Sequence, residues 1–132
     1  MGKVPVKFKK AVVDSFRRHA WNMGISHYHA DILYMKDDKS SGNNHTLADI
    51  DVNRRYLTCQ LRVFPALIER WKKSGMGELE DVIAHETAHI LTQHLYDCGA
   101  ARYQDPSEMI DAWEALTEAI SRISIKLDKG LR

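Results

Sequence analysis

The segment 85–89 reads His-Glu-x-x-His, and this pattern constrains the surrounding fold more than any other feature of the sequence. Residues four apart lie on the same face of an α-helix, so His85 and His89 can direct two imidazoles at one metal ion from such a helix. Glu86 follows the first histidine, and its carboxylate lies beside that face. The segment therefore predicts a helix that presents two metal ligands and an adjacent acid.

The residues around this segment indicate a helix over residues 78–96, with two apolar stripes on its surface. One stripe contains Leu79, Ile83 and Ile90, and the other contains Ala84, Ala88, Leu91 and Leu95. A helix with two apolar stripes packs between two layers of a fold. The two histidines lie on the border of the first stripe.

Zinc is the metal that this pattern favours. Neutral imidazole nitrogen is a good zinc ligand, and a catalytic zinc site keeps one coordination position open for water. On a helix, His-Glu-x-x-His is the pattern of zinc-dependent hydrolases, in which the glutamate acts as general base. We therefore expect Zn²⁺ on His85 and His89, with Glu86 as a catalytic residue. The alternative is a buried helix whose histidines only form hydrogen bonds.

Three further helices are expected from the periodicity of apolar residues. They cover residues 8–23, a short stretch from 65 to 74, and residues 106–127. The apolar stripe of the last helix contains Met109, Trp113, Leu116, Ile120, Ile123 and Leu127. Together with the strands described next, these helices predict a single α+β domain over residues 1–132.

Three strands are expected over residues 31–36, 46–52 and 56–63, where apolar and polar residues alternate. A turn at residues 53–55 joins the last two strands into a hairpin, and the polar segment 37–44 is expected to be a loop. The strands predict a small, mainly antiparallel sheet with one packed face.

A catalytic zinc site needs a third protein ligand in addition to the two histidines. One known form of the pattern continues with a glycine and a third histidine, where this chain has Thr92 and Leu95, so that form is excluded. A glutamate from the following helix is the remaining standard choice, and Glu114 and Glu118 are the candidates. Both could instead lie in solvent, with Glu118 paired to Arg122 at i+4.

Residues 113–118, Trp-Glu-Ala-Leu-Thr-Glu, resemble the second motif of the gluzincins, the metallopeptidase clan typified by thermolysin. That motif reads Asn-Glu-x-x-Ser-Asp. Glu114 matches its glutamate, and Thr117 and Glu118 match its serine and aspartate. Trp113 replaces the asparagine. In length and element order the chain is also similar to the smallest gluzincins, the minigluzincins, and to small metallopeptidase-like chains of phage genomes.

This resemblance implies a zincin-like fold, with Glu114 as the third zinc ligand and Glu118 as the residue that supports the first histidine. The roles of the two glutamates could be exchanged. It also implies that the chain is a zinc metallopeptidase acting on a peptide or protein substrate. A metal-activated water would attack the carbonyl, and Glu86 would pass the proton of that water to the leaving amine.

Two further expectations concern the surroundings of the metal. Larger gluzincins stabilise the oxyanion with a Tyr and a His outside the two motifs, and Tyr103 is the first candidate for this role here, with Tyr96 second. The sheet is expected to offer an edge strand to an extended substrate, although the sequence does not indicate which edge.

Composition adds few constraints. The net charge of +1 gives no overall electrostatic reason to expect nucleic-acid or membrane binding. The N-terminal residues include lysines but no apolar stretch like that of a signal peptide, so a cytoplasmic location is expected.

Two alternative functions stay open. The chain could be a zinc-containing binding or regulatory module, of phage origin or not, or a nucleic-acid-associated protein that uses its basic first helix. Nothing in the sequence defines an oligomeric state.

Overall fold

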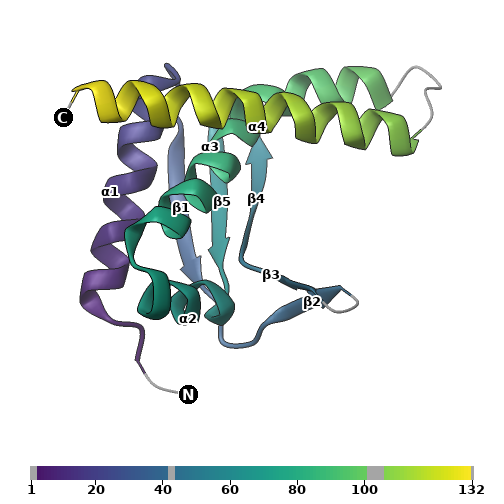
Figure 1. Ribbon diagram of the computed structural model, residues 1–132. Coiled ribbons are helices and arrows are strands. Elements are labelled where there is room, and N and C mark those ends of the chain that lie inside the picture. The colour runs from purple at the N-terminus through teal and green to yellow at the C-terminus, as the bar shows by residue number, and fades with distance from the viewer. Residues whose placement is uncertain (1–2, 42–43, 101–105, 132) are drawn as a thin grey trace.

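The chain folds into an α+β structure, as predicted. The computed structural model describes residues 3–41, 44–100 and 106–131. In chain order the elements are α1 (Val6–Asn22), β1 (His29–Tyr34), β2 (Lys39–Ser41), β3 (Asn44–Thr46), β4 (Ala48–Asn53), β5 (Thr58–Val63), α2 (Pro65–Ser74), α3 (Met76–Ala100) and α4 (Pro106–Leu131). Each predicted helix and strand is present, with its ends within a few residues of the predicted ones, and Figure 1 shows their arrangement.

Strand β5 forms the centre of a three-stranded sheet with the order β1-β5-β4. It pairs antiparallel with β4, so the predicted hairpin is confirmed, and Ile50 lies opposite Leu61. It pairs parallel with β1, where Ile32 lies opposite the same Leu61. The sheet is therefore mixed, and the prediction of a mainly antiparallel sheet is wrong for one of the two pairings. The reason is that β1 does not pair with β4 but with β5, which runs in the same direction as β1.

The polar segment 37–44, predicted as a loop, contributes to a short two-stranded ribbon instead. Strands β2 and β3 pair antiparallel, and Lys39 lies opposite Thr46. The residues of this ribbon are polar on both faces, so they lack the apolar alternation that identifies a strand in a sequence. Lys39 also forms an ion pair with Asp49 of β4, with 3.2 Å between Nζ and Oδ2.

One face of the three-stranded sheet is packed and the other is polar. Along β5, Leu61 and Val63 are buried in the core. Arg62 lies on the opposite face, where it forms ion pairs with Asp49 and Asp51 of β4. This alternation is typical of a sheet with one covered face. Figure 1 shows α1 and α3 against the covered face and α4 along the top of the molecule.

The most deeply buried part of the core lies where α1 and α3 meet the sheet. Phe8 and Val12 of α1 and Leu79 and Ile83 of α3 have no exposed surface. The first predicted stripe of α3 is therefore buried, as expected. The second stripe is buried at its alanines but not at its leucines, which are exposed.

Leu79→Ala is expected to lower the free energy of unfolding by about 2–5 kcal/mol, because it removes fully buried methyl groups and leaves a cavity. Urea denaturation measures the change. The matched control is Leu95→Ala on the same helix, where the leucine is 57% exposed, and its expected effect is about 0.5 kcal/mol or less. Equal losses for the two variants would contradict this description of how α3 packs.

Helix α4 turns a different face to the core from the one its apolar pattern predicts. Its buried residues are Thr117, Ser121, Ser124, Ile125 and Asp128. Three members of the predicted stripe are exposed instead, namely Leu116 (38%), Ile123 (66%) and Leu127 (45%). Periodicity identifies the apolar face of a helix but not the element that covers it. The core therefore does not cover these three residues of the predicted stripe.

Candidate metal centre

Helix α3 presents both predicted histidines on one face. The ring centroids of His85 and His89 lie 4.9 Å apart. The side chain of His89 is nearly buried, with 8% of its surface exposed, whereas that of His85 is 23% exposed. One imidazole therefore lies at the edge of the core and the other opens toward solvent, as the position of the pair on the border of the apolar stripe predicts.

Glu114 of α4 brings its carboxylate to both imidazoles. Its Oε2 lies 3.0 Å from Nε2 of His85, and its Oε1 lies 3.1 Å from Nε2 of His89. One ligand atom from each of the three side chains lies within 4.8 Å of the other two. Two ligands at roughly 2.0–2.1 Å from a tetrahedral zinc ion are about 3.3 Å apart. The two separations between histidine and glutamate are close to this value, so the three side chains could hold a zinc ion.

Glu118 lies one turn further along α4 and contacts the other nitrogen of His85. Its Oε2 is 2.7 Å from Nδ1 of His85, and its Oε1 accepts a hydrogen bond from Nε of Arg122 at 2.9 Å. Glu118 thus makes both the contact with His85 that the supporting role needs and the contact with Arg122 that was the alternative. The hydrogen bond with His85, followed by the charges of His85 and Arg122, lowers the pKa of Glu118 against the opposing effect of burial.

The two glutamates are distinguished by the nitrogen that each contacts. Glu114 contacts the Nε2 atoms of both histidines. Glu118 contacts only one of the two rings, at Nδ1 of His85. A histidine that binds metal through one nitrogen usually donates its other N–H to a carboxylate or carbonyl, which fixes the tautomer and the ring orientation. This geometry favours Glu114 as ligand and Glu118 as support.

His89 is oriented by a chain of hydrogen bonds that sequence reasoning missed. The hydroxyl Oγ1 of Thr117 lies 3.3 Å from Nδ1 of His89, and it donates to the carbonyl oxygen of Trp113 at 2.8 Å. Thr92 Oγ1 lies 2.8 Å from the Thr117 hydroxyl and accepts the indole N–H of Trp113 at 2.8 Å. The match of Thr117 to the serine of the gluzincin motif was the one sequence signal for this contact with His89. Trp113, in the position of the motif asparagine, makes a polar contact through its indole N–H.

Burial lowers the pKa of His89 to about 4, although the charge of Glu114 opposes the shift. The ring is therefore neutral at neutral pH and carries a single N–H. Its Nδ1 lies 3.3 Å from the Thr117 hydroxyl, and its Nε2 lies 3.1 Å from a carboxylate oxygen of Glu114. The tautomer with the proton at Nδ1 leaves the lone pair of Nε2 available to a metal ion, whereas the other tautomer donates a hydrogen bond to Glu114.

Glu86 lines a cleft of about 410 Å³ beside His85. Leu47 and Ala48, where the chain enters β4, also line this cleft. Burial, followed by the charges of Glu114 and Asp49, raises the pKa of Glu86 to about 8. The carboxyl group therefore keeps its proton at neutral pH in the metal-free chain. A nearby divalent cation would favour the charged form and lower this pKa.

Glu86→Gln is expected to change the pH dependence of stability in the metal-free chain. The Glu86 carboxyl loses its proton near pH 8 when folded, against an ordinary value of 4.5. Between these pH values the folded state binds more protons than the unfolded state, so the contribution of Glu86 to stability falls as pH rises. The amide cannot titrate. The stability of the variant relative to the wild type should therefore increase from pH 4.5 to about 8.

Urea denaturation across this pH range, with a chelator present, measures the difference. Glu69→Gln, at an exposed position of α2, is the control for the change of side chain itself. If the difference between Glu86→Gln and the wild type did not vary with pH, the described burial of Glu86 would be wrong.

The two predicted oxyanion-stabilising tyrosines have different outcomes. Tyr103, the first candidate, lies outside the described residues. Tyr96 stacks on Trp113 with 4.1 Å between ring centroids, and the Trp113 ring in turn lies 4.5 Å from that of His89. Tyr96 is therefore separated from the His89 ring by one aromatic side chain.

A second group of possible metal ligands is buried where α1, α3 and α4 meet. It consists of His19, Glu80 and Asp128. The guanidinium of Arg18 already supplies a cation there, at 3.2 Å from a carboxylate oxygen of Glu80 and 3.2 Å from one of Asp128. We interpret this group as an ion-pair network that ties the three helices together.

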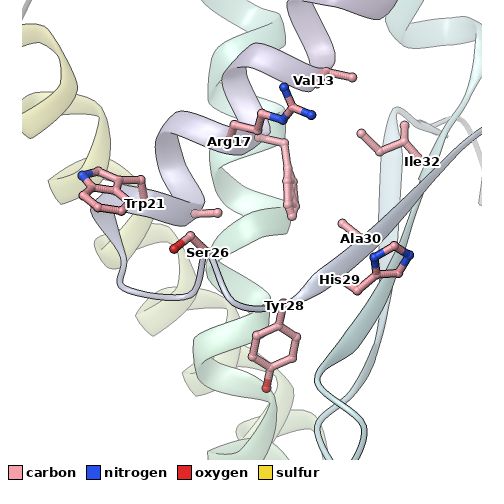
Figure 2. A pocket seen from close by; sticks show the side chains of 10 residues that line it. Val13, Arg17, Trp21, Ser26, Tyr28, His29, Ala30 and Ile32 are labelled. Atoms are coloured by element: carbon pink, nitrogen blue, oxygen red, sulfur yellow. The ribbon is translucent and has the colours of Figure 1, made fainter.

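A larger hollow lies between α1 and β1 and has a volume of about 620 Å³. Figure 2 shows Val13 and Arg17 of α1 across it from Ala30 and Ile32 of β1. The described residues that line it include no group with the geometry of metal ligands. The candidate site is therefore the one at His85 and His89, where titratable groups converge.

Comparisons with protein-family models, with curated proteins and with solved structures found no match to the chain. The resemblance to gluzincins therefore depends on the segments 85–89 and 113–118 and stays a prediction. Within the described ranges, no helix is both long enough and apolar enough to cross a membrane.

Proposed function

We propose that this chain is a zinc-dependent hydrolase of peptide bonds, with zinc held by His85, His89 and Glu114. The observation that carries the proposal is the convergence of two imidazole nitrogens and one carboxylate within 4.8 Å. Two nitrogen ligands and one oxygen ligand form a ligand set that catalytic zinc sites use. Glu118 and Thr117 each contact Nδ1 of one histidine, so that both Nε2 atoms face the Glu114 carboxylate, where a shared metal ion would bind.

The residues around the metal divide the chemistry between them. Zinc would polarise the peptide carbonyl and lower the pKa of a water molecule. Glu86 accepts the proton of the attacking water and delivers it to the amide nitrogen as the C–N bond breaks. Its burial suits this role, because a carboxyl group with a raised pKa holds the transferred proton more readily than an exposed one.

Strand β4 is the edge that we assign to the substrate. It lies at one end of the order β1-β5-β4, and the residues that lead into it line the cleft beside His85. Among the described residues no strand pairs with its outer edge. An extended peptide that pairs with this edge would pass the cleft that Glu86 also lines. The other edge strand, β1, borders the hollow against α1 instead.

The direct test is hydrolysis of an unstructured protein mixture, namely reduced and alkylated serum proteins, in ¹⁸O-labelled water. Zinc-loaded protein should produce new peptide termini that carry ¹⁸O in their carboxyl groups. A chelator should abolish these products, and added zinc should restore them. If the zinc-loaded chain produces no labelled termini from this mixture or from a peptide library, the proposed activity is not supported.

Thr117→Val is expected to weaken zinc binding by about 10–100-fold, because His89 loses the acceptor that orients its ring. Competition with a chromophoric chelator measures the affinity. Thr117→Ser keeps the hydroxyl and should bind zinc nearly as the wild type does. Equal affinities for the Val and Ser variants would show that the hydroxyl does not support the site.

A further inference from the structure

We propose that two copies of this chain associate through α4, with the two helices packed side by side in antiparallel orientation. The proposal starts from the face of α4 that the core leaves uncovered. Leu116, Ile123 and Leu127 are exposed, and Ile120 between them is only partly buried. Single chains rarely expose contiguous apolar surface of this kind unless it binds something.

The spacing of these residues fits the pairing of two helices. Leu116, Ile120, Ile123 and Leu127 recur at intervals of four, three and four residues. This is the heptad pattern of a coiled-coil seam, in which each side chain inserts between side chains of the facing helix. Ala112 and Ala119 are exposed beside the large residues. Large and small side chains that alternate in this way interdigitate and allow two helices to approach closely.

The charges along α4 favour a second copy as the occupant. The beginning of the helix exposes Glu108 and Asp111, and its end exposes Lys126 and Lys129. An antiparallel pair related by a twofold axis places the acidic end of each helix beside the basic end of the other. A parallel pair would place like charges together at both ends. The charges of α4 are therefore complementary to those of a second, antiparallel copy of the same helix.

The opposite face of α4 would be unaffected by this association. Thr117, Ser121 and Ser124 are buried within the chain, and Glu114 and Glu118 contact the histidines of α3. Figure 1 shows α4 along the outside of the molecule. The interface does not depend on the proposed hydrolytic function, because it uses other side chains.

Sedimentation equilibrium of the full chain tests the proposal. The wild type should have twice the chain mass of 15.2 kDa. Ile123→Glu should raise the dissociation constant of the dimer at least about tenfold, because it places a charge at the centre of the seam. The fold should be kept, since Ile123 is 66% exposed, and far-UV circular dichroism checks it. If that variant does not fold, Ala119→Arg at an exposed position of the same face replaces it.

The matched control is Val6→Glu, which changes an equally apolar, 82% exposed side chain on α1 and should leave the mass unchanged. Zero-length cross-linking of mixed ¹⁴N and ¹⁵N chains tests the orientation, and links from Glu108 or Asp111 of one copy to Lys126 or Lys129 of the other are expected. A monomeric wild type, or a dimer that Ile123→Glu and Ala119→Arg leave intact, would overturn the proposal. Isotopically mixed links that place like ends of the two helices together would overturn the antiparallel orientation.

Discussion

Glu86→Gln is expected to lower peptide hydrolysis by about 10²–10⁴-fold while the zinc content stays unchanged. The amide has nearly the same shape as the carboxyl group but cannot accept the proton of the attacking water. Glu86 is not among the three side chains that converge on the metal position, so its replacement should not remove a ligand. The measurement pairs initial rates on one cleaved peptide with zinc per chain from elemental analysis.

Asp81→Asn is the matched control for this variant. Asp81 lines the same cleft and is about half exposed, and it pairs with Arg122 at 3.7 Å. Its replacement removes one negative charge from the cleft without removing a proton acceptor from the reaction, so activity should stay close to that of the wild type. If the zinc-loaded Glu86→Gln variant hydrolysed peptides as fast as the wild type, the proposed mechanism would be wrong. A binding or regulatory module with a zinc site would then be the better interpretation.

Glu114→Ala is expected to lose zinc under conditions in which Glu118→Ala retains it. One carboxylate oxygen of Glu114 lies 3.0 Å from Nε2 of His85 and the other lies 3.1 Å from Nε2 of His89, so its removal leaves only two protein ligands. Of the two histidines Glu118 contacts only His85, at Nδ1, and a residue in that position typically contributes about 10–100-fold to metal affinity. Competition titrations with a chelator rank the two variants.

Glu108→Ala, at an exposed position in the first turn of α4, controls for the loss of one carboxylate from the same helix. It should bind zinc as the wild type does. A reversed order, in which Glu118→Ala loses the metal and Glu114→Ala keeps it, would exchange the roles of the two glutamates. Equal and small effects for both would mean that α4 does not supply a ligand.

The sequence could predict which side chains converge because they lie on helices at fixed spacing. His85 and His89 are one turn apart on α3, and Glu114 and Glu118 are one turn apart on α4, so one contact between the helices brings all four together. The support of His89 by Thr92 could not be predicted in the same way. Thr92 and Thr117 are 25 residues apart, and their contact depends on how closely the two helices approach.

The errors in the predicted fold have a common physical origin. Apolar spacing along α4 indicates a helix with an apolar stripe, yet hydroxyl side chains such as Ser121 and Ser124 pack inward and Ile123 faces solvent. Likewise, the alternation of apolar and polar residues along each strand does not indicate which strand it pairs with, so the pairing of β1 with β5 could not be predicted. Local periodicity determines which residues share a face, whereas the partner of that face is decided by the whole chain.

The most direct test of the proposed metal site is X-ray absorption at the zinc edge, together with zinc per chain, on wild-type protein prepared in a metal-replete medium. We expect about one zinc per chain, with two imidazole nitrogens and carboxylate oxygen among its ligands. In His89→Ala we expect this two-imidazole signal to be lost. Wild-type protein that binds no zinc, or zinc held by sulfur rather than by imidazole, would contradict the site at His85, His89 and Glu114.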